Sequence, residues 1–170
     1  TCATPVDLAQ WTFENYTAST STQNGPFDAS YRAQDISSAQ GVYGAYGSSA
    51  SGIANPSTCP TGWSCPSSNG NTGNSWGIRS GWPNTWGGTG SSPYFQFEVH
   101  GASAYGGIGI TMTYNLEGNW SNRGPWYIYF STDGTNWSQV GTGTFTANPS
   151  QWRTGIAAST TSTGNDSVYF

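Results

Sequence analysis

The chain has 170 residues, and its eight acidic and four basic residues give a net charge of -4. It has neither a basic surface to neutralise phosphates nor an apolar run of about 18 residues, so we expect no binding to nucleic acid and no membrane insertion. Only 34% of the residues are hydrophobic, but 15% are aromatic, which supplies enough large side chains for one folded core.

Residues 1–8 show no apolar periodicity, so we expect an amino-terminal arm followed by a single domain over residues 9–170. Trp11 and Phe13 alternate with polar residues, which predicts a first strand from about Ala9 to Thr17. The sequence begins with Thr rather than Met, as expected for a mature product whose leader has been removed. We therefore expect a secreted protein, extracellular or at the cell surface.

Residues 53–93 are rich in Gly, Asn, Ser and Pro and predict a long loop region with one short strand at about Ser75 to Arg79. Cys59 and Cys65 bracket a short stretch there, with no His or further Cys nearby. This spacing favours a disulfide between them over a zinc site, and hence an oxidising compartment. For Cys2, a free thiol, a link to another subunit and a partner cysteine outside the sequence are the alternatives.

The clearest periodicity lies between Tyr94 and Thr146, where apolar and polar residues alternate as in half-buried strands. Three successive stretches share this pattern: residues 94–99, 108–117 and 126–130. Asp133 and Gly134 then predict a tight reversal before a strand at about Ser138 to Thr146. We therefore predict an antiparallel all-β meander, followed by strands at about 152–156 and 167–170.

The segment GPWYIYFSTDGTNWSQVG, preceded by SPYFQFEV and the alternating ITMTYNL run, resembles the secreted jelly-roll β-sandwich domains of bacteria. Such domains occur in surface proteins, beside extracellular hydrolases and among carbohydrate-binding modules. The resemblance covers residues 9–170 and implies an all-β, antiparallel β-sandwich of jelly-roll type. Because the same scaffold serves glycan binding, surface display and polymer building, the resemblance leaves the function open.

The resemblance also implies an incomplete sheet edge. In these domains a strand like SVYF is followed by one more strand that closes the sandwich beside the first strand, and none follows here. We expect the resulting groove to be filled from another subunit by the arm, with the chain's own arm and residues outside the sequence as the other candidates. Val6 and Leu8 have the alternate spacing needed to enter successive pockets, and Cys2 would lie near such a junction.

Related jelly rolls often hold a structural Ca²⁺ with acidic residues near the first and last strands. This implies Glu14 and Asp166 as calcium ligands here, with ordinary solvated carboxylates as the alternative, and we expect no other cofactor. The carboxylates are dispersed along the sequence, and no G-x-S-x-G-like elbow accompanies the single histidine, His100. We therefore predict that the chain is not an enzyme.

Glycan binding is predicted from tryptophans, because flat indole rings stack on the C–H faces of sugars. Five tryptophans lie in predicted loops: Trp63, Trp76, Trp82, Trp86 and Trp120. The alternative for each is a structural role, either capping the core or lying in a subunit contact.

Two functions remain. The sequence favours an extracellular structural protein whose subunits associate with one another by strand donation into a filament or surface layer. The alternative is a non-catalytic carbohydrate-binding module, for which a polysaccharide is the partner.

Overall fold

A computed structural model describes residues 4–19, 21–44, 51–54, 74–78, 93–114, 125–145 and 153–170. Over these ranges the chain is all-β, as predicted, with no helix and therefore none that could cross a membrane. The strands are β1 (Ala9–Gln10), β2 (Phe27–Asp28), β3 (Tyr31–Arg32), β4 (Ser38–Gly44), β5 (Ser51–Ala54), β6 (Ser75–Ile78), β7 (Tyr94–His100), β8 (Gly109–Tyr114), β9 (Pro125–Phe130), β10 (Ser138–Thr144), β11 (Arg153–Ser159) and β12 (Ser167–Tyr169).

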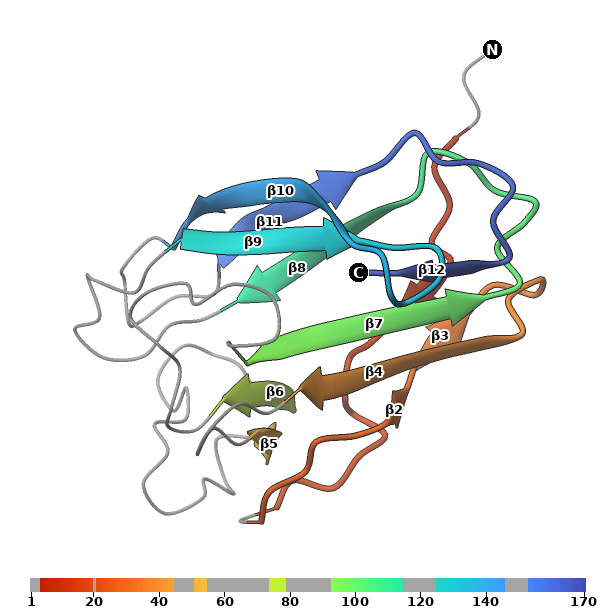
Figure 1. The fold of residues 1–170 in the computed structure, drawn as a ribbon. Coiled ribbons are helices and arrows are strands. Elements are labelled where there is room, and N and C mark those ends of the chain that lie inside the picture. Colours follow the sequence, from red (N-terminus) through yellow and green to blue (C-terminus); the bar gives the residue numbers. More distant parts are fainter. Residues whose placement is uncertain are drawn as a thin grey trace.

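The centre of the fold is a four-stranded antiparallel sheet in the order β12-β7-β4-β2 (Figure 1). β7 pairs along its whole length with β4, and its last residues pair with β12 on the other side. β12 is hydrogen-bonded on both edges: Phe170 exchanges two backbone bonds with Phe97, and Tyr169 exchanges two with Ser131. It therefore joins β7 to the chain just after β9.

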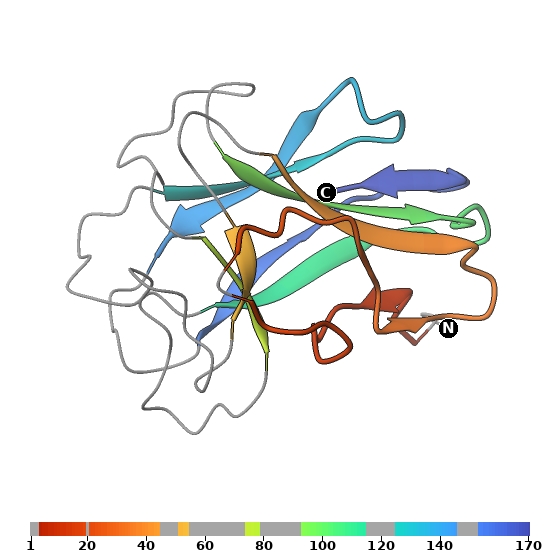
Figure 2. The ribbon, with the colours of Figure 1, turned by 90° about the horizontal axis from the view of Figure 1, so that it is seen from below.

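The other strands form antiparallel pairs, β1 with β3, β5 with β6, β8 with β11 and β9 with β10. Figure 2 shows β8 and β11 on one side of β4 and β7, so the strands lie in more than one layer. β10 approaches β11 closely, because a Cβ added to Gly141 would lie 2.9 Å from the Cβ of Ala158. These contacts place the β9-β10 and β8-β11 pairs next to each other.

The predicted meander is wrong in its pairing. Strands exist at the three predicted positions, and β9 pairs with β10, the next strand along the chain, as predicted. However, β7 pairs with β4 and β12 rather than with β8, and β8 pairs with β11 rather than with β9. Alternation shows that a strand has one buried face without showing which strand lies beside it. The pairing follows from tertiary packing between distant segments, which periodicity does not report.

The predicted first strand, Ala9 to Thr17, is also wrong in extent. Only β1 is paired, with β3, and the chain then turns at Phe13, whose φ of 60° is incompatible with an extended strand. The Tyr16 N–H donates to the Phe13 carbonyl at 3.2 Å, which closes this turn. The groove that we expect beside a first strand over residues 9–17 therefore lacks the long strand that would form one of its sides.

Inward-facing residues of the central sheet form the core. The buried cluster combines residues of β4, β7 and β12 with residues from loops and the end of β9: Ile36, Ala39, Val99, Ala102, Ile108, Phe130 and Val168. The ring of Phe170 packs on that of Phe130, with centroids 5.2 Å apart. Because side chains alternate along a strand, the same strands carry a second set on the face turned away from the core.

The reversal between β9 and β10 is built around Asp133. Its carboxylate accepts the backbone N–H of Asn136 at 2.7 Å, the side-chain amide of Asn136 at 2.7 Å and the backbone N–H of Thr135 at 2.8 Å. The Ser131 hydroxyl donates to it at 2.9 Å. These bonds, led by those from Asn136, hold the pKa of Asp133 well below its usual range. Gly134 has a φ of 70°, which confirms the predicted tight reversal.

Replacing Asp133 by Asn should lower the melting temperature by a few degrees at pH 7, because the amide cannot offer the same charged acceptor. A lowered folded-state pKa stabilises the fold above the ordinary value of 3.8, and this contribution is lost as the pH falls through the lowered value. The difference between wild type and Asp133→Asn should therefore shrink steadily below about pH 4. Thermal unfolding followed between about pH 2 and pH 7 tests this, and a constant difference would contradict it.

Candidate functional site

Most residues predicted to act in binding lie outside the described residues. This holds for four of the five loop tryptophans and for all three cysteines: Trp63, Trp82, Trp86, Trp120, Cys2, Cys59 and Cys65. Their roles in glycan binding, subunit linkage and the disulfide stay predictions.

Trp76, on β6, lies inside a cluster of aromatic rings. Its centroid is 4.5 Å from that of Phe95, 4.9 Å from Phe27, 5.6 Å from Phe13 and 6.0 Å from Phe97. Most of these contacts are edge-to-face, the favourable geometry for aromatic pairs. The ring therefore contributes to packing between β6 and the central sheet. For Trp76 this agrees with the structural role that the sequence leaves open as the alternative to glycan binding.

Glu14 and Asp166, the predicted calcium ligands, make separate contacts. Glu14 Oε1 accepts the backbone N–H of Asn74 at 2.8 Å, and the Asp166 carbonyl accepts the Ala102 N–H at 2.9 Å. In the described part of the chain, no three His, Cys, Asp or Glu side chains gather into a group that could hold a metal ion. Calcium binding by these two residues stays a prediction.

Val6 and Leu8, the predicted subunit contacts, differ in environment. Val6 is 61% exposed and lies in a run of exposed residues, 4–7. Leu8 packs against the core, and its carbonyl accepts the Ala33 N–H at 2.9 Å. Val6 is therefore available to a second molecule, whereas Leu8 is engaged within its own chain.

The central sheet turns a set of polar and aromatic side chains away from the core. We call this set the outer face: Asp28 on β2, Ser38 and Gln40 on β4, Tyr94, Gln96, Glu98 and His100 on β7, and Ser167 and Tyr169 on β12. The strand register places Asp28, Gln40, Glu98 and Tyr169 in one row across the four strands. Side chains from segments far apart in the sequence are thus brought side by side.

Tyr94 lies at one end of the outer face, with its ring over Gly44 of the neighbouring strand β4. A Cβ added to Gly44 would lie 2.2 Å from two atoms of this ring, so a glycine is needed for the ring to lie there. Tyr94 nevertheless remains 46% exposed. The ring therefore covers Gly44 while nearly half of the residue stays in contact with solvent.

Tyr169 lies at the other end of the outer face, beside the turn after β9. Its ring lies 3.5 Å from where a Cβ on Gly134 would be. It also contacts the rings of His100 and Trp137 edge-on, with centroids 5.9 and 6.4 Å away. Aromatic groups therefore stand at both ends of the outer face.

The polar side chains of the outer face support one another. The Gln40 amide donates to Asp28 Oδ1 at 2.8 Å, and His100 Nδ1 lies 2.8 Å from Ser167 Oγ. The Glu98 carboxylate lies 3.9 Å from His100 Nε2. A carboxylate accepts several hydrogen bonds and an amide both donates and accepts, so these groups retain capacity for a ligand's hydroxyls.

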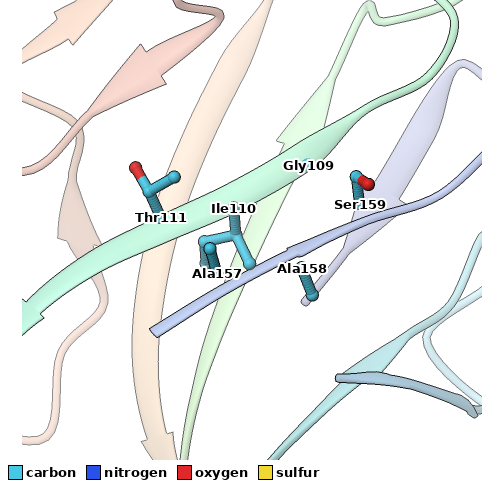
Figure 3. Close-up of a pocket in the computed structure, with 6 residues that line it drawn as sticks. All are labelled: Gly109, Ile110, Thr111, Ala157, Ala158 and Ser159. Atoms are coloured by element: carbon cyan, nitrogen blue, oxygen red, sulfur yellow. The ribbon is translucent and has the colours of Figure 1, made fainter. Parts of the chain in front are cut away.

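A shallow hollow of about 330 Å³ lies over β8 and β11, outside the central sheet (Figure 3). It is lined by small or aliphatic residues: Gly109, Ile110, Thr111, Ala157, Ala158 and Ser159. None of these side chains is charged, so the hollow offers no group for acid–base chemistry or for holding an ion.

The alternating pattern that predicts β7 also predicts part of the outer face, because it places Tyr94, Gln96 and Glu98 on the polar side of the strand. Sequence reasoning missed the site because Gly44 and Tyr169 lie far away along the chain. Their places beside β7 depend on strand pairings that the sequence pattern does not give.

No family model, no curated protein and no solved structure matches the chain. The function therefore has to be inferred from the geometry of the outer face and of the exposed arm.

Trp76→Ala should lower the free energy of unfolding by about 3 kcal/mol, because it empties the centre of an aromatic cluster. Trp76→Phe, which keeps a ring there, is the matched control and should cost less than half as much. Chemical denaturation of both variants measures the difference. A Trp76→Ala protein as stable as the wild type would show that the ring is not part of the core.

Proposed function

We propose that the chain is a secreted, non-catalytic carbohydrate-binding domain, a β-sandwich of jelly-roll type that binds a polysaccharide on its outer face. The observation that carries this proposal is Tyr94, whose ring rests on Gly44 while the residue stays 46% exposed. An aromatic ring held against the backbone with one side open is the platform on which the C–H face of a sugar stacks.

The surroundings of Tyr94 suit the same ligand. Sugars present apolar ring faces and many hydroxyls, so their sites combine aromatic surface with a few placed polar groups. On β7, Gln96 and Glu98 follow Tyr94 at alternate positions and therefore point to the same side of the sheet. The outer face thus offers stacking and hydrogen bonding along one strand.

The sheet also lowers the entropic cost of binding. β7 is paired with β4 along its whole length and with β12 at its last residues, which fixes the backbone beneath these side chains. Gly44 restricts where the Tyr94 ring can lie before any ligand arrives. A pre-ordered surface loses less conformational freedom on binding, which favours affinity. This surface supports glycan binding without a contribution from the loop tryptophans, whose role remains a separate prediction.

Self-association into a filament or surface layer is the second candidate. It is favoured by one observation, the 61% exposure of Val6 in the run of exposed residues 4–7. An exposed β-branched residue in an exposed amino-terminal run suits insertion beside a strand of another subunit. Because the first strand is short, the acceptor would have to lie elsewhere than beside residues 9–17.

Tyr94→Ala should weaken binding to an insoluble polysaccharide by about 1 to 3 kcal/mol if a sugar stacks as other planar ligands do, which is roughly five- to 150-fold. Tyr31→Ala is the matched control, because Tyr31 is 50% exposed but lies on β3, outside the outer face. Binding isotherms on cellulose, xylan, mannan and chitin measure the effect. Equal losses in the two variants, or no retention of the wild type on any of these polymers, would refute the proposal.

Val6→Asp tests the second candidate, because a charge at this position opposes burial in another subunit. If the arm joins subunits, the wild type should form larger species as its concentration rises and Val6→Asp should remain monomeric. Leu8 is left unchanged in this variant, because it packs against the core of its own chain and replacing it would disturb folding. Analytical ultracentrifugation decides, and identical sedimentation of both proteins as monomers at high concentration would exclude this role.

A further inference from the structure

We infer that the ligand of the outer face is an uncharged, extended polysaccharide that contacts both Tyr94 and Tyr169 through about five consecutive sugar units. This inference rests on the proposed function and adds to it the class of ligand and the length of the bound segment.

The two tyrosines lie far apart along the strands. Tyr169 pairs with Glu98, and Glu98 follows Tyr94 on β7 by 98 − 94 = 4 residues. With a rise of about 3.4 Å per residue in antiparallel strands, this offset corresponds to roughly 14 Å.

The rings also lean away from each other across the strands. Tyr94 leans over Gly44 on β4, whereas Tyr169 leans over Gly134 in the turn beyond β12. The rings therefore lie about three strand spacings apart, or roughly 14 Å at about 4.8 Å per spacing. Combining both offsets gives a diagonal of roughly 20 Å between the two platforms.

This diagonal sets the length of the ligand. Taking an advance of about 5 Å per sugar unit, close to one strand spacing, about four advances separate the two rings, so about five consecutive units place one unit on each platform. A disaccharide reaches one ring at a time. The units between the rings pass over Gln96 and Glu98, whose amide and carboxylate can bond their hydroxyls.

The charge of the outer face selects against acidic glycans. Its described side chains include the carboxylates of Asp28 and Glu98 and no Arg or Lys. The Asp133 carboxylate, in the same turn as Gly134, adds a third negative charge near Tyr169. A uronate or sulfate placed here meets like charge, which lowers affinity. An uncharged sugar meets no such repulsion.

Calorimetric titration with oligosaccharides of about two to six units tests the inference. The neutral probes are cello-, xylo- and manno-oligosaccharides, and the acidic probes are oligogalacturonates of the same lengths. For the neutral series that binds, affinity should rise at least about tenfold between two and five units and then level off. Each acidic probe should bind at least about tenfold more weakly than the neutral probe of equal length.

Tyr169→Ala separates the two platforms. This variant should bind the six-unit probe no more than a few-fold better than the two-unit probe, because only Tyr94 remains, while Tyr31→Ala should keep the full length dependence. If short and long probes bind the wild type equally and Tyr94 is still required, or if acidic probes bind more tightly, the inference is wrong and the proposed function stands. If neither the polymers nor any probe binds, both fail.

Discussion

The pairing of β7 between β4 and β12 is the constraint on which the rest of the structure depends. Pairing with β4 along the whole strand and with β12 at its last residues fixes β7, and strict alternation then sends Val99 into the core and Glu98 to the opposite side. Core packing therefore determines the composition and spacing of the outer face. A one-residue slip of register would exchange the two sets of side chains, which links the stability of the fold to the integrity of the site.

The sequence predicts where strands lie better than which strands meet. The alternation from Tyr94 onward locates β7, β8 and β9, and the Asp133-Gly134 pair locates the reversal before β10. The same pattern suggests a meander, but the pairs join segments as distant as β4 and β7 or β8 and β11. Period-two alternation describes one strand and its two faces, so the choice of neighbour requires information about packing.

The candidate site shows the same limit more sharply. The Tyr94–Gly44 and Tyr169–Gly134 contacts each join an aromatic ring to a glycine on another segment, so neither residue alone signals a site. Conversely, the sequence draws attention to Trp76, which packs among other rings. Exposure distinguishes the two predicted or proposed contacts for which it differs: Tyr94 is open to solvent, whereas Leu8, predicted to bind another subunit, packs against its own core.

The central claim is that the outer face, rather than the loops, contacts the sugar. Nuclear magnetic resonance titration with a neutral oligosaccharide that the protein retains tests it most directly, because each residue reports separately. We predict shifts for the aromatic signals of Tyr94 and Tyr169 and for the side-chain amide of Gln96, with little change at Tyr31 on β3. Shifts confined to residues 53–93, with Tyr94 and Tyr169 unchanged, would contradict the account.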